Sequence, residues 1–359
     1  MTISGTNDVR QIAKGLDLPI HQHTFDGIFE AVREAVYDMI ADSPYPKIRK
    51  LSQLERVICN ARQIKIEFID NDEDIRRIAD ERSYVADELE TKLRNHFDKR
   101  GNAGFTCENN SHGRIGRRWL VVVDRRGSKK NGAEFTKWHE IAHVLTGFFP
   151  ASNDDIEHQA DTETPEKEPD SPGEQLMERI AAELLYWENL WNPQFSDKLR
   201  QVDRLTFDII EDIRSRYQPT ASFHSCAIHV VKQFHRPCYL VKADMAHNKT
   251  EKRKIVRNEN QTTLGPAFAP ELPPKKLRLV DCVTPNHIEG PNPLEIWKHV
   301  RVPEDSVIAK VFRGEARHAT EETNQAKWET SRKGSLSAVP LYVEAKAYGT
   351  NIFGLLSIC

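Results

Sequence analysis

The sequence has few of the features that mark membrane, secreted or nucleic-acid-binding proteins. No stretch approaches the roughly 20 apolar residues that a membrane-spanning helix needs, and the first 25 residues lack a charged-then-apolar signal pattern. The six cysteines are scattered without a C-x-x-C pair, which is typical of reduced thiols rather than of a disulfide framework. We therefore expect a cytoplasmic protein with no membrane partner.

The chain also lacks a strong excess of either charge. Its formal net charge is −3 over 359 residues, so there is no overall basic field to attract nucleic acid, and direct nucleic-acid binding is not expected. The 38% apolar and 29% charged residues fit a soluble globular enzyme. The length exceeds the size at which one hydrophobic core usually keeps growing, which favours two domains.

The hydrophobic pattern changes along the chain. Helical periodicity dominates residues 25–40, 52–61, 73–97, 131–146, 174–192, 196–217 and 221–234, with strand-like runs at 64–70 and 119–123. After residue 236, short apolar runs are separated by Pro, Gly and Asn. This pattern predicts an α+β fold, with a mostly helical domain over 1–235 that contains a small sheet. A smaller, β-containing domain follows over 236–359.

One internal segment is strongly acidic. Residues 151–173 contain eight carboxylates, one lysine and three prolines, with almost no apolar side chain. Such a composition cannot bury a core and predicts a mobile surface loop.

The helix after the acidic segment has a clear start, with Ser171 as the N-cap, Pro172 at the first helical position and Glu174 two residues later.

The most specific chemical motif is H-E-x-x-H, at His139, Glu140 and His143. Residues four apart lie on one face of a helix, so the two imidazoles can bind one ion, while Glu140 can reach a water on that ion. Zinc suits this donor set, because a catalytic zinc needs three protein ligands and an open position. The alternative is a histidine pair on an ordinary helix face, but two unpaired imidazoles would be costly to bury in so apolar a helix.

A third ligand must come from another element. Glu174 and Glu178 lie one turn apart in the next predicted helix, so one could bind the ion while the other orients an imidazole. We expect Glu174 to be the ligand and Glu178 to be a second-shell residue or an alternative ligand. Glu174 also stands where a capping-box glutamate would fall, and a carboxylate cannot easily serve both purposes.

Two segments resemble a known family. "EFTKWHEIAHVL" is similar to the R-F-T-x-A-H-E-x-x-H block of the ImmA/IrrE zinc metallopeptidases, and "EQLMERIAAELL" resembles their E-x-x-A/C-N/D-x-F-A-A-x-L-L helix. The resemblance covers roughly residues 64–234. It implies a zincin-like helical domain with a small sheet, and zinc held by His139, His143 and Glu174. It also implies Glu140 as the general base, as in gluzincins, and often a transcriptional repressor as the substrate.

The strand before the zinc motif has two interpretations. In zinc peptidases, an edge strand can bind an extended substrate by pairing with it, and this reading makes Leu120, Val121 and Val122 the substrate strand. An ordinary central strand is an equal alternative. The donor that stabilises the oxyanion is open among three side chains, namely His112, Tyr186 and Arg179.

Taken together, these patterns predict a zinc-dependent endopeptidase of restricted specificity. Its substrate would be a regulatory protein, such as a DNA-binding repressor or an antitoxin-like regulator, and the second domain would recognise the substrate or sense a signal. Two alternatives stay open. The chain could be a non-catalytic regulatory binding protein on a zincin scaffold, or a zinc hydrolase of small amides.

Overall fold

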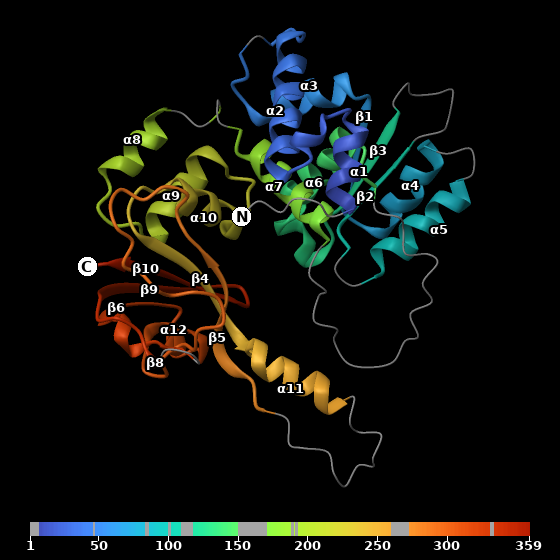
Figure 1. Cartoon of the computed structure of the whole chain (residues 1–359). Coiled ribbons are helices and arrows are strands. Elements are labelled where there is room, and N and C mark those ends of the chain that lie inside the picture. Colours follow the sequence, from blue (N-terminus) through green and yellow to red (C-terminus); the bar gives the residue numbers. More distant parts are fainter. Residues whose placement is uncertain are drawn as a thin grey trace. The chain divides into compact units, whose positions relative to one another are not determined.

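The computed structural model of the chain describes residues 7–45, 47–82, 86–99, 102–108, 118–149, 171–187, 190, 193–259, 273–330 and 334–359 (Figure 1). This part is α+β, as predicted, and no helix in it is long and apolar enough to cross a membrane. Contacts divide the chain into two compact units, residues 1–191 with 220–222, and residues 192–219 with 223–359. Residues 151–170 of the predicted acidic loop lie outside the described residues.

The first unit surrounds a small sheet with helices. Its helices are α1 (Asn7–Gly15), α2 (Phe25–Ala41), α3 (Leu51–Ala61), α4 (Asp72–Arg82), α5 (Ala86–Phe97), α6 (Ala133–Thr146) and α7 (Pro172–Leu185). Its strands are β1 (Ile64–Ile69), β2 (Gly104–Glu108) and β3 (Trp119–Asp124). The helix predicted over 73–97 is two helices, α4 and α5. β2 lies in the segment 101–116, whose sequence contains four glycines, and it pairs with β3.

The three strands lie in the order β1-β3-β2, with β1 parallel and β2 antiparallel to the central β3. Val121 and Val123 pack into the core on the side of α6 and α7, whereas Leu120 and Val122 pack against α4 and α5 on the other face. A strand that is buried on both faces is apolar at every position. This burial explains the uninterrupted apolar run in β3.

The predicted substrate strand is therefore wrong. Leu120, Val121 and Val122 have partners in both β1 and β2, so the backbone of β3 has no free edge for a peptide. The central-strand alternative is the correct one. In the described part of the sheet, the edge strand next to β3 on the other side from β1 is β2.

A buried carboxylate fixes the end of β3. Asp124 is fully buried and accepts hydrogen bonds from the backbone N–H and Nε of Arg126, at 3.0 and 2.9 Å, and from Lys129 Nζ at 2.6 Å. Burial alone would raise the pKa of Asp124, but the bonds from Arg126 and Lys129 outweigh it and lower the pKa. The pair of cations thus holds the turn that leads from β3 towards α6.

We expect Asp124→Asn to lower the free energy of unfolding by about 3 kcal/mol at neutral pH, because it leaves two cations without their buried partner. The pKa of Asp124 is lower in the native state than in the unfolded state, so its charged form stabilises the fold at pH values above the unfolded pKa. This stabilisation is lost as the pH falls towards the native pKa. The difference between variant and wild type should therefore shrink below about pH 4. Denaturant unfolding at several pH values measures this, with Asp70→Asn in the exposed pair with Arg125 as a control. An equal loss in both variants would contradict the account.

The second unit is built on a five-stranded antiparallel sheet in the order β5-β4-β10-β9-β6. The strands are β4 (Cys238–Ala246), β5 (Lys276–Val283), β6 (His318–Asn324), β9 (Pro340–Tyr348) and β10 (Asn351–Ile358), and β7 (Glu329–Thr330) and β8 (Gly334–Ser335) form a separate pair. The helices are α8 (Pro193–Gln201), α9 (Phe207–Tyr217), α10 (Phe223–Gln233), α11 (Lys249–Glu259) and α12 (Val307–Phe312). The unit has its own apolar core between the sheet and α12.

The division between the units comes earlier in the chain than the predicted boundary at 235. The backbone N–H of Phe207 at the start of α9 donates to Glu344 of β9 at 3.0 Å, and the Phe223 ring of α10 stacks on Tyr348 at 3.6 Å. α9 and α10 therefore pack on the five-stranded sheet. The change from helical to strand-like sequence at 236 marks a change of element within one unit.

Candidate metal centre

The H-E-x-x-H motif lies in α6, whose other face is held by ion pairs around the buried Lys137. Lys137 is buried and its Nζ contacts Glu55 at 2.5 Å and Glu134 at 2.7 Å. Glu134 also accepts a bond from the Trp138 indole at 3.2 Å. α6 begins at Ala133, two residues after the predicted start, with Gly132 as its N-cap and no side-chain cap. The contacts of Glu134 with Lys137 and Trp138 help to fix the rotation of α6.

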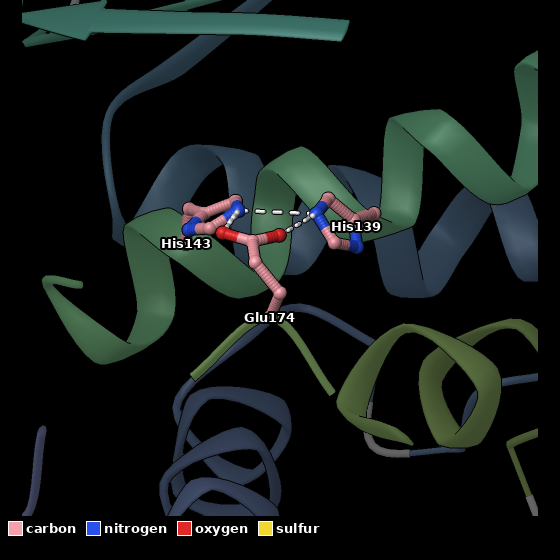
Figure 2. Close-up of side chains that lie close together, drawn as sticks. All are labelled: His139, His143 and Glu174. Atoms are coloured by element: carbon pink, nitrogen blue, oxygen red, sulfur yellow. Dashed lines mark hydrogen bonds and ion pairs between the residues drawn. The ribbon is translucent and has the colours of Figure 1, made fainter. Parts of the chain in front are cut away.

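Three of the predicted ligands lie together (Figure 2). His139 Nε2 lies 3.1 Å from Glu174 Oε2 and 3.1 Å from His143 Nε2, and His143 Nε2 lies 3.7 Å from Glu174 Oε1. One donor atom from each residue falls within 4.8 Å of the other two. Among the described residues this is the group of His, Cys, Asp and Glu side chains that could hold a metal ion.

The separations are compatible with three ligands of one metal ion. Donor atoms on a tetrahedral ion with bonds of about 2.1 Å lie about 3.4 Å apart, close to the observed 3.1–3.7 Å. Two imidazole nitrogens that face each other can share a proton but otherwise offer two lone pairs to the same point. The donor set of two imidazoles and a carboxylate is one that divalent transition metals accept.

The end of α6 orients His143. Gly147 follows the helix in a left-handed conformation with φ of 65°, which returns the chain so that the Phe148 carbonyl accepts a 2.6 Å bond from His143 Nδ1. A proton on Nδ1 leaves the Nε2 lone pair directed towards His139 and Glu174. Burial would lower the pKa of His143, but the nearby Glu174 and Glu140 carboxylates raise it.

The start of α7 positions Glu174. Ser171 Oγ accepts a bond from the Glu174 backbone N–H at 3.3 Å, so the cap is supplied by serine and the glutamate side chain is free to reach the histidines. A Cβ added at Gly173 would lie 2.4 Å from the Phe148 ring. Because glycine has no side chain, the start of α7 can approach the end of α6 closely. Burial would raise the pKa of Glu174, but the hydrogen bonds with His139 and His143 hold it well below its usual range.

Glu140 lies beside the triad and contacts the edge strand β2. It is 9% exposed, and the Thr106 hydroxyl donates a 2.6 Å hydrogen bond to its Oε2. A Cβ added at Gly104 would lie 2.2 Å from its Oε1, so only glycine leaves room for the carboxylate here. His96 Nε2 lies 2.6 Å from the Gly104 carbonyl, and burial lowers the pKa of His96. The neutral imidazole therefore donates to that carbonyl and fixes the start of β2.

Several of these contacts were missed from the sequence. Thr106 and His96 belong to no recognisable motif. Their contacts depend on the pairing of β2 with β3, which brings β2 next to α6. Gly104 did carry a signal, since a glycine inside a strand often marks the close approach of another group. That signal was hidden by the three other glycines of the same segment.

The remaining candidates lie elsewhere. Glu178 is exposed one turn further along α7 and is outside the ligand group. Of the expected oxyanion donors, Arg179 is paired with Asp26 at 2.7 Å and Tyr186 is buried. His112 lies outside the described residues.

Comparison with known proteins adds little. No protein-family model matches the chain, and no curated protein matches it. A solved structure, a Mycobacterium tuberculosis transcriptional regulator, aligns with 98% of this chain and 80% of its own, at 11% identity and a TM-score of 0.42.

Proposed function

We propose that the chain is a zinc-dependent endopeptidase of restricted specificity. The observation that carries the proposal is the convergence of His139, His143 and Glu174, from two helices, beside the buried carboxylate of Glu140. A His-His-carboxylate set with an adjacent glutamate is typical of catalytic zinc sites rather than of structural ones, which usually have four protein ligands. The resemblance to ImmA/IrrE peptidases assigns the same four residues to the same roles.

The residues of the chain would divide the reaction between them. His139, His143 and Glu174 would hold the zinc, which when bound acts as a Lewis acid and makes water acidic enough to attack a peptide carbonyl near neutral pH. Glu140 accepts the proton of the attacking water and later passes it to the leaving amine. The Thr106 hydroxyl occupies Oε2 of Glu140, so it orients the carboxylate and leaves Oε1 as the oxygen that takes the proton.

The substrate in this proposal is an extended segment of a regulatory protein, such as a transcriptional repressor or an antitoxin-like regulator. The support is the resemblance, together with the position of β2. β2 is an edge strand in the described part of the sheet, and it lies against Glu140. An extended peptide that pairs with such an edge would pass the reacting carboxylate.

Removal of the metal provides the test. We expect chelation to abolish cleavage of a proteome-derived peptide mixture, and stoichiometric zinc to restore it, because a chelator competes with the three side chains for a reversibly bound ion. Mass spectrometry of the products measures this, with chelated protein after addition of Mg²⁺ as a control. Cleavage that survives chelation at an unchanged rate would rule out the proposal.

A further inference from the structure

An aromatic surface lies beside the candidate metal centre. Trp119 at the start of β3 stacks on Phe149, with ring centroids 4.8 Å apart and planes inclined by 19°. The Phe149 ring is in turn 6.2 Å from the His143 ring, at an angle of 26°. We call Trp119 and Phe149 the aromatic shelf. It connects a metal ligand to the sheet through two ring contacts.

The shelf is accessible. Phe149 is 38% exposed, one of four large apolar side chains exposed in the described part of the chain, and Trp119 is half-buried. Arg118 covers one side of Trp119, with its guanidinium 5.4 Å from the indole, and pairs with Glu108 of β2 at 3.2 Å. Isolated exposed aromatics are common, but a stacked pair next to a reactive site is a candidate contact surface.

The register of the sheet relates the shelf to Glu140. On the face towards α6, Thr106 pairs with Val121 and the next row pairs Glu108 with Trp119. Thr106 contacts Glu140, so the shelf lies one same-face interval further along the strands, or about 7 Å. An extended peptide repeats its same-face side chains at the same interval.

From this match, and resting on the proposed function, we propose that the shelf selects peptides with an aromatic or large aliphatic side chain within two residues of the cleaved bond. That side chain would lie on Phe149 and Trp119 while the backbone runs along β2. Stacking on a fixed aromatic pair gains both buried area and ring contact. Glycine at the same position would gain neither.

The test compares two synthetic peptides that differ only in Phe or Gly two residues from the cleaved bond. We expect wild-type protein to show about a tenfold higher kcat/KM for the Phe peptide, the scale of burying one apolar side chain. Phe149→Ala should reduce this ratio to near one, with metal content retained. Trp297→Ala removes an aromatic of similar exposure, 41%, in the second unit, and should leave the ratio unchanged. Trp119→Ala, checked for its metal content, provides a second variant of the shelf.

Failure of the shelf and failure of the proposed function give different results. If wild type cleaves both peptides equally well, or Phe149→Ala keeps the preference, the shelf assignment is overturned while the peptidase stands. If zinc-loaded wild type cleaves neither peptide, the peptidase proposal fails. In that case, fluorescence anisotropy of the same two peptides, each carrying a fluorescent label, tests whether the aromatic shelf binds the Phe side chain. Tighter binding of the Phe peptide that is lost in Phe149→Ala supports it, and equal binding overturns it.

Discussion

Glu140→Gln is expected to lower the rate of peptide cleavage by about 10²–10⁴-fold, the usual contribution of a positioned general base. The amide has nearly the same shape as the carboxylate but cannot accept the proton of the attacking water. It can still accept the Thr106 hydroxyl bond at its carbonyl oxygen, so the packing of β2 against α6 should persist. Because Glu140 is not among the three ligands, zinc content should equal that of wild type.

Glu178→Gln is the matched control for this experiment. It makes the same chemical change on the neighbouring helix α7, at an exposed glutamate outside the ligand group. Its cleavage rate should equal that of wild type. A Glu140→Gln protein that binds zinc and cleaves at the wild-type rate would show that Glu140 is not the base.

The second large effect is expected from adding a single methyl group to β2. In Gly104→Ala the new Cβ would approach Glu140 Oε1 to 2.2 Å and its Cδ to 2.7 Å. The obstructing atoms belong to a side chain, so Glu140 can turn away, although this loses its bond from Thr106. Displacing a catalytic group by about 1 Å can cost about 10²-fold in rate. We therefore expect cleavage to fall about 10²-fold, with a free energy of unfolding lowered by about 1–3 kcal/mol, too little to unfold the protein.

Gly132→Ala controls for the loss of a glycine near α6. The nearest atom to its added Cβ is the Lys129 carbonyl oxygen at 3.8 Å, so neither rate nor stability should change much. If Gly104→Ala retained full activity, β2 would have to yield instead of Glu140. The close packing of β2 on the carboxylate would then have no role in catalysis.

The grouping of His139, His143 and Glu174 could be predicted from the sequence because its information is local. His139 and His143 share a helix face by spacing alone, and the capping sequence from Ser171 to Glu174 fixed where α7 begins. The choice between Glu174 and Glu178 needed more than spacing, since both share a helix face. The structure favours Glu174, whose backbone is capped by Ser171 while its carboxylate turns to the histidines.

What could not be predicted depends on pairing between distant segments. The pairing of Thr106 with Val121 decides that Thr106 meets Glu140, and no periodicity encodes that register. The position of β3 at the centre of the sheet was suggested by its unbroken apolar run, yet an edge strand under a covering loop could have the same composition. The unit boundary failed for a similar reason, because the contact of Phe207 with Glu344 spans 137 residues.

We propose that His139, His143 and Glu174 bind one zinc ion. The test is elemental analysis of protein purified without chelator, on wild type, His139→Ala, Glu174→Ala and Glu178→Ala. We expect one zinc per chain in wild type and in Glu178→Ala, none in His139→Ala, and strongly reduced content in Glu174→Ala. Wild type without a stoichiometric metal, or His139→Ala with the full amount, would contradict the claim and the peptidase proposal built on it.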